Sequence, residues 1–111
     1  EGDEMGRHED SGALSESTFY ILLSLHEPMH GYAIMQNVQV LTNGRITIGA
    51  GTLYGALTAL AEKNWIRALN EHISGRRKEY VITEQGKDAF LNEVDRLSRL
   101  IADAKTVTRG N

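Results

Sequence analysis

The stretch WIRALNEHISGRRKEYVIT, residues 65–83, is where the apolar period of the chain becomes two residues. This period covers residues 66–71 and again residues 78–82, and it predicts two β-strands. The pair Ser74-Gly75 between them is typical of a turn, so the stretch predicts a β-hairpin. Three consecutive basic residues occupy the tip of this hairpin: Arg76, Arg77 and Lys78.

Helical periodicity precedes the hairpin, with apolar residues three or four positions apart. It predicts three helices, over residues 11–25, 30–41 and 50–64. Ser11 or Ser15 is a suitable cap for the first helix, because a serine hydroxyl accepts a hydrogen bond from an amide of the first turn. Pro28 ends the first helix and Asn43-Gly44 ends the second.

A longer helix is predicted after the hairpin. Thr83 is a capping residue, and the apolar residues that follow it are spaced four and three apart, as in a coiled coil. The chain is therefore mainly α with a small β-hairpin, in the order of a winged helix-turn-helix, a module that binds DNA. We expect a winged helix-turn-helix over residues 11–83 and a C-terminal dimerisation helix over residues 84–108.

The composition is that of one small globular domain. The 111 residues are 41% hydrophobic and 24% charged, and no apolar run approaches the roughly 20 residues that cross a bilayer. Cysteine is absent, which excludes disulfides and thiolate metal sites. Residues 1–10 contain five acids and one arginine, unlike a signal peptide. We expect these residues to be an acidic tail, disordered or introduced by cloning, and the protein to be cytoplasmic, with no membrane contact.

The segment His26-Glu27-Pro28-Met29-His30 matches the zinc-binding pattern H-E-x-x-H. That pattern requires one continuous helix, which holds both imidazoles on the same face. Pro28 removes a backbone donor and clashes with the preceding turn, so it breaks the helix between the two histidines. We therefore expect no metal site here.

The glycines that precede the third predicted helix resemble a dinucleotide-binding fingerprint. Gly49, Gly51 and Gly55 follow a short apolar stretch, and Glu71 lies where the fingerprint has its acid. The glycine spacing is off by one residue, and the chain beyond it predicts a hairpin and one helix instead of further parallel strands. No nucleophile, base and pocket come together elsewhere. We expect no enzyme activity and no cofactor.

Several short blocks of the sequence together resemble the PadR family of transcriptional regulators. They are His30-Gly31-Tyr32, Gly51-Thr52-Leu53-Tyr54, Trp65-Ile66 and Gly75-Arg76-Arg77-Lys78-Glu79-Tyr80. The single C-terminal helix is similar to the short subfamily. The resemblance implies a homodimeric repressor that binds an inverted-repeat operator in double-stranded DNA, and some relatives sense a small-molecule effector.

The chain departs from the family pattern at two places. Gly55 stands where the family usually has proline, and the last helix contains no tryptophan on which a flat aromatic drug could stack. Glycine weakens a helix by roughly 1 kcal/mol relative to alanine, so we expect the start of the third helix to be less rigid. No effector can be named from these residues.

The candidate DNA contacts are on the third helix, at the hairpin tip and at the start of the second helix. The leucines of the third helix face inward, so Thr52 and Thr58 lie on a small outward face that fits a major groove. Tyr54 is at the edge of this face, where its hydroxyl reaches a phosphate, or else its ring packs on the second helix. For Tyr32 a phosphate contact and a purely structural role are both open. The expected set is Tyr32, Thr52, Tyr54, Thr58, Arg76, Arg77 and Lys78.

The apolar stripe of the last helix predicts a partner. Two heptads are fewer than a self-sufficient coiled coil needs, so the first helix is expected to share the interface. The alternative is a last helix that covers the core of its own domain. The expected interface residues are Leu14, Phe19, Leu22, Phe90, Val94, Leu97 and Ile101.

From these residues we expect a sequence-specific DNA-binding transcriptional regulator, a repressor that works as a homodimer. The alternative is a winged-helix module that binds another protein and no DNA. Four acids near the same elements leave that alternative open: Glu62, Glu71, Glu79 and Glu84.

Overall fold

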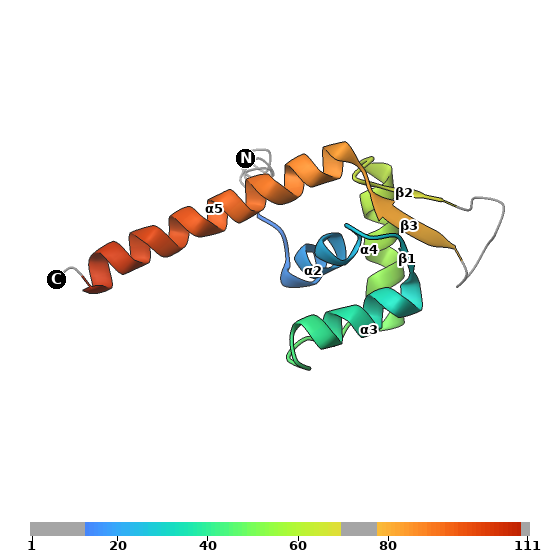
Figure 1. Ribbon diagram of the computed structural model, residues 1–111, viewed down its shortest axis with the longest axis horizontal. Helices are drawn as coiled ribbons and strands as arrows, with labels where there is room; N and C mark the ends of the chain where they lie inside the picture. The colour runs from blue at the N-terminus through green and yellow to red at the C-terminus, as the bar shows by residue number, and fades with distance from the viewer. Residues whose placement is uncertain (1–12, 70–77, 110–111) are drawn as a thin grey trace, which may run out of the picture.

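The computed structural model describes residues 13–69 and 78–109 (Figure 1). Within these residues there are four helices and one three-stranded antiparallel sheet with strand order β1-β3-β2. In chain order the elements are α2 (Glu16–Ser24), β1 (Met29–His30), α3 (Gly31–Leu41), α4 (Ala50–Glu62), β2 (Ile66–Ala68), β3 (Glu79–Ile82) and α5 (Glu84–Arg109). The predicted fold class is confirmed. The acidic tail and the hairpin tip with Arg76 and Arg77 lie outside the described residues.

Three helices begin at a capping side chain. Ser15 caps α2, His30 caps α3 and Thr83 caps α5. Each side chain accepts a hydrogen bond from the amide three residues further on, at 3.1, 3.3 and 3.0 Å. Of the two caps that the sequence left open for the first helix, Ser15 is the one used, so this helix begins at Glu16 and not at residue 11.

The sheet contains one strand that the periodicity did not reveal. β1 has two residues, and it pairs with β3 so that Met29 lies opposite Tyr80 and His30 opposite Glu79. The sequence predicted only a turn at Pro28 and a helix after it. Two residues are too few to show a period of two, so this strand is visible only through its pairing.

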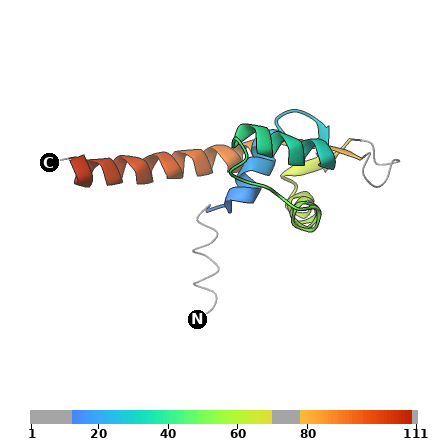
Figure 2. The ribbon, with the colours of Figure 1, turned by 90° about the horizontal axis from the view of Figure 1, so that it is seen from below.

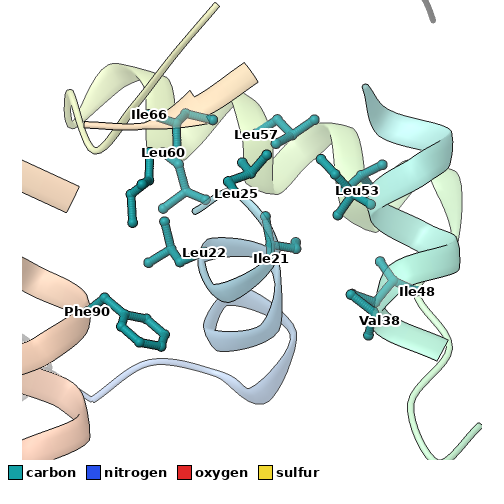
Figure 3. Close-up of a cluster of buried hydrophobic side chains, with 12 residues drawn as sticks. Ile21, Leu22, Leu25, Val38, Ile48, Leu53, Leu57, Leu60, Ile66 and Phe90 are labelled. Atoms are coloured by element: carbon teal, nitrogen blue, oxygen red, sulfur yellow. The ribbon is translucent and has the colours of Figure 1, made fainter. Parts of the chain in front are cut away.

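The core lies where α2, α3, α4 and the sheet meet, with a contribution from the first half of α5 (Figure 3). Twelve apolar side chains of the described residues are buried in it. They are Ile21, Leu22, Leu25, Ile34, Val38, Ile48, Leu53, Leu57, Leu60, Ile66, Ile82 and Phe90.

Two residues that the sequence placed at a dimer interface belong to this core. Leu22 is fully buried and Phe90 is 6% exposed. The Phe90 ring packs against Phe19 of α2, with ring centroids 4.8 Å apart. An apolar stripe has the same spacing whether it faces its own domain or a partner, and at these two positions it faces its own domain. The alternative expectation, a last helix that covers its own core, therefore holds for the first half of α5.

The second half of α5 projects away from the body of the protein (Figures 1 and 2). Every residue from 98 to 109 is exposed. At 100° per residue Leu97, Ile101 and Ala104 lie on the same face of the helix as Phe90 and Val94, with Leu100 at the edge of this face. α5 thus extends its buried face into an uncovered one, formed by Leu97, Leu100, Ile101 and Ala104.

The first turn of α5 lies directly against the chain at the end of α4. A Cβ atom at Gly86 would be 2.1 Å from the carbonyl oxygen of Trp65, so only glycine fits at this position. The Thr83 hydroxyl donates a hydrogen bond to the carbonyl of Asn64 at 2.7 Å. We call this contact the α4–α5 joint.

We predict that alanine has opposite effects at two helical glycines. Gly86→Ala should lower the free energy of unfolding by about 1–3 kcal/mol, because its methyl group forces the backbone of the α4–α5 joint apart. Gly55→Ala should raise it by about 0.5–1 kcal/mol, because alanine favours the helix and nothing lies within 4 Å of the new Cβ. Urea denaturation of the two variants and of the unchanged chain measures both changes in the free energy of unfolding. Equal effects of the two substitutions would show that the joint is not tightly packed.

Candidate nucleic-acid interface

α4 has one buried face and one exposed face. Leu53, Leu57 and Leu60 are at most 3% exposed, as the spacing predicted. The opposite face is made of small side chains, and Glu62 is the one charged residue among those of α4 that form it. Its exposed residues are Gly51, Thr52, Gly55, Thr58, Ala59 and Glu62. This face can approach another molecule closely, because little side-chain bulk stands between that molecule and the helix backbone.

The hydroxyl of Thr58 is partly committed to its own helix. It donates a hydrogen bond to the carbonyl oxygen of Tyr54 at 3.0 Å. The oxygen can still accept a hydrogen bond, and the methyl group is exposed on the same face. Thr58 therefore suits an amino-group donor or a methyl group on a DNA base edge better than an acceptor.

Tyr54 packs against the start of α3. A Cβ atom at Gly31 would lie 2.3 Å from the Tyr54 hydroxyl oxygen and 3.2 Å from Cδ2 of Leu53. The packing of this ring on the second helix, which the sequence left open as an alternative, is thus the arrangement present. A contact between the Tyr54 hydroxyl and a phosphate stays a prediction.

A groove of about 360 Å³ separates α4 from the sheet. It brings together two of the predicted residues, Thr58 from α4 and the half-buried Lys78 just before β3. Glu62 lines the same groove, so its carboxylate and the Lys78 ammonium group give it both signs of charge. The remaining lining residues are Leu57, Ala61, Ala68 and Tyr80.

Tyr80 is a groove residue that the sequence did not single out as a candidate DNA contact. Burial raises the pKa of its hydroxyl, and the nearby Tyr54 adds to this effect. The hydroxyl is therefore protonated at neutral pH and can donate a hydrogen bond. Its membership of the Gly75–Tyr80 block was the available signal, but alternation alone does not say which face of a small sheet borders a groove.

Tyr32 and the two histidines singled out in the sequence precede α4 in the chain. Tyr32 is 56% exposed in the first turn of α3. The imidazole of His26 has its Nδ1 atom 3.0 Å from the carbonyl of Leu22, while His30 caps α3. In the ranges that the structure describes, no three His, Cys, Asp or Glu side chains are grouped so that they could hold a metal ion. None of the helices there is long and apolar enough to span a bilayer.

Comparison with known protein families decides the identity of this fold. The model of the transcriptional regulator PadR-like family matches residues 13–92. The chain belongs to the PadR-like family. This is a family of transcriptional regulators, and the resemblance seen in the short sequence blocks is confirmed.

Solved structures of PadR regulators have the same fold as this PadR-like chain. A PadR family transcription regulator from Clostridium difficile R20291 is 32% identical with a TM-score of 0.57, over 82% of this chain and 96% of that one. A PadR family regulator from Eggerthella lenta superposes with a TM-score of 0.68 at 24% identity, over 85% and 82% of the two chains. Both of these proteins are described as transcriptional regulators of the PadR family.

A longer relative contains a similar segment. An uncharacterised 37.1 kDa protein in transposon TN4556 of Streptomyces fradiae is 32% identical over 87 residues. The match covers 78% of this PadR-like chain and 24% of that protein. The chain therefore spans about a quarter of the length of this relative.

A buried carboxylate joins α5 of the PadR-like chain to the segment before α2. The Glu93 side chain is 2% exposed. Its two carboxylate oxygens accept hydrogen bonds from Nε and Nη2 of Arg96 at 2.7 and 2.8 Å. The amide of Leu14 donates a third hydrogen bond to it at 3.1 Å. We call these three residues the Glu93 joint; the sequence analysis missed it, because an acid on an amphipathic helix has the pattern of a solvated charge.

The Glu93 joint predicts a specific dependence of stability on pH. The hydrogen bonds from Arg96 and the Leu14 amide hold the pKa of the Glu93 carboxyl below its usual range, although burial opposes them. A lowered folded-state pKa contributes stability above the unfolded value of about 4.3, and this contribution is lost as the pH falls through the folded pKa.

We therefore expect the difference in free energy of unfolding between the unchanged chain and Glu93→Gln to be constant from pH 7 to about pH 5 and to shrink at lower pH. Other carboxyl groups titrate in both proteins and cancel in this difference. Urea denaturation between pH 3 and pH 7 measures it. A difference that does not vary with pH would contradict a charged, hydrogen-bonded Glu93.

Proposed function

We propose that this PadR-like chain is a sequence-specific repressor that binds double-stranded DNA as a homodimer. The observation that carries the proposal is the exposed face of α4, which has small side chains, is nearly uncharged and lies next to Lys78, the residue before β3. An α-helix fits the major groove of B-DNA, and short side chains let it enter deeply. In this arrangement α4 contacts base edges through Thr52 and Thr58.

In this proposal the basic residues just before β3 contact the DNA backbone beside the groove that α4 enters. Lys78 precedes β3 on the edge of the α4 groove, and Arg76 and Arg77 come immediately before it in the sequence. Ammonium and guanidinium groups neutralise phosphates, which supplies affinity that does not depend on base sequence. Tyr32, exposed at the start of α3, and Tyr54 are further proposed phosphate contacts.

The uncovered face of α5 supplies the dimer contact in this proposal. Leu100 and Ile101 are 51% and 54% exposed, on the helix half that no other described element covers. Two such faces pair by removing apolar side chains from water. The proposed interface also includes three half-buried residues where the uncovered face of α5 meets the body of the protein: Leu14, Phe19 and Val94. Leu22 and Phe90 are buried in the core and are left out of the interface.

Two-fold symmetry then sets the form of the DNA site. A dimer with one α4 in each chain presents two equal DNA-binding surfaces, so its operator is an inverted repeat. Occupation of such a site near a promoter gives repression. Release by a small-molecule effector is part of the proposal through the family, and we assign no residue to it.

We predict that charge and base contacts respond differently to mutation. Replacing Arg76 and Arg77 by alanine removes up to four phosphate contacts per dimer, and each should lower the slope of log affinity against log salt by ~0.9. Affinity should fall for operator and random DNA alike. Thr58→Ala should leave the salt slope unchanged and reduce discrimination against mismatched operators by about 1 kcal/mol.

Fluorescence anisotropy with duplexes selected in vitro by the unchanged chain, and with scrambled duplexes, measures both effects over a range of salt. The matched control is Lys105→Ala with Arg109→Ala, which removes two charges from the exposed half of α5 and should leave the slope as it was. If the hairpin double variant keeps both affinity and slope, the hairpin does not contact DNA. The module that binds another protein then becomes the better proposal.

We also predict that two lysines on the uncovered face of α5 prevent dimer formation. Leu97→Lys with Ile101→Lys puts four charges into an apolar interface, where they lose hydration without a partner. The control is Ala102→Lys with Thr106→Lys, which has the same charge and the same spacing on the opposite face of the helix. Sedimentation velocity should give monomers for the first variant and dimers for the second. Dimers in both cases would place the interface elsewhere.

A further inference from the structure

The Glu93 joint lies where α5 leaves the body of the protein. Phe90 and Val94 pack against the core, and beyond Leu97 every described residue of the helix is exposed. The Arg96 side chain is 27% exposed, so the ion pair lies at the end of the packed half of α5 that is nearer to the solvent. At the other end of this packed half, the α4–α5 joint holds the first turn of α5. The direction in which the exposed half points is thus set between these two joints.

Stability alone does not account for a buried carboxylate at this position. The loss of hydration of a buried ion pair offsets most of its attraction, and apolar side chains of similar volume often replace such a pair with no loss of stability. What the Glu93 carboxylate adds is a contact that sets the direction of α5 relative to another segment of the chain. The Leu14 amide donates a hydrogen bond to Glu93 and so ties α5 to the segment that leads into α2. The two hydrogen bonds from the Arg96 guanidinium group lie within α5 and hold the Glu93 carboxylate in the position that accepts this bond.

The length of the exposed half converts a small rotation into a large displacement. Residues 97–109 extend about 20 Å beyond the joint at 1.5 Å per residue. A tilt of about 10° at the joint moves the far end by roughly 3–4 Å, which is close to the 3.4 Å rise of one base pair. A change of this size alters the distance between two α4 helices by about one base-pair step.

We propose that Glu93 is a positioning residue that sets the half-site spacing of the operator accepted by the dimer. This inference rests on the proposed function, because it needs two α4 helices that bind one DNA duplex. Glu93 itself lies in the interior of its own chain and touches no DNA. Its effect is transmitted through the direction of α5.

Two substitutions of Glu93 separate positioning from folding. Glu93→Gln keeps an acceptor for the Leu14 amide but loses the ion pair that holds this acceptor in place, and Glu93→Met replaces the acceptor with an apolar side chain. In both variants Arg96 can extend into water, since it is already partly exposed. The matched control is Asp95→Asn, which breaks the exposed pair between Asp95 and Arg99 on the same helix.

The experiment uses the full chain and DNA that it selects from a random duplex library. Duplexes with the selected half-sites are made at the selected spacing and with one or two base pairs inserted or removed between the half-sites. Fluorescence anisotropy gives the affinity for each duplex and for a duplex with a single half-site. Sedimentation velocity and thermal denaturation report dimer formation and folding.

The unchanged chain and Asp95→Asn should prefer one spacing at least tenfold over its neighbours. Glu93→Gln and Glu93→Met should remain folded dimers with unchanged single half-site affinity, and their spacing preference should fall below threefold or move to another spacing. A merely structural role of Glu93 would lower the melting temperature and leave the preference among spacings unchanged.

Several results would overturn the inference. The inference is wrong if the Glu93 variants keep the native spacing preference, or if Asp95→Asn loses the preference to the same extent. It is also wrong if neither Glu93 variant folds. An unchanged chain that binds DNA with no spacing preference overturns it too and leaves the proposed function intact. An unchanged chain that selects no DNA sequence overturns both proposals.

Discussion

The packing of the first turns of α5 against the winged-helix body is the constraint on which the rest of the structure depends. Gly86 has no side chain, so α5 can lie against the carbonyl of Trp65 just after α4. One turn later Phe90 enters the core beside Phe19. α5 is therefore part of the core over its first half and a projecting arm over its second (Figure 1), and the direction of the arm is tied to α4.

The described residues form one small core, and both α4 and α5 contribute to it with one face while another part of each helix stays exposed. The inward leucines hold α4 on the core, which leaves its small outward face for another molecule. One face of α5 packs on the body of the protein, and the continuation of this face beyond Leu97 is exposed to solvent. In our proposal the first surface meets DNA and the second meets a second copy of the chain. The joints at Gly86 and Glu93 connect the two surfaces within each chain.

The features that the sequence predicted are those with local signals. Helical and strand periods, together with caps such as Ser15 and Thr83, place the elements to within a few residues, and the leucine spacing identifies the outward face of α4. The missed features depend on contacts distant in the chain. β1 exists only by pairing with β3, and the stripe around Phe90 does not say which molecule it faces. Glu93 has the pattern of a solvated charge until the amide of Leu14 is seen beside it.

The distance between the two α4 helices in the free dimer tests the central claim most directly. The chain contains no cysteine, so Gly55→Cys provides one spin-labelling site per chain, and nothing lies within 4 Å of the position where its side chain begins. If α5 pairs two copies for binding in successive major grooves, electron paramagnetic resonance should give a separation of about 34–36 Å, one helical turn of DNA. The absence of coupling between labels, or a separation far below one helical turn, would contradict this account.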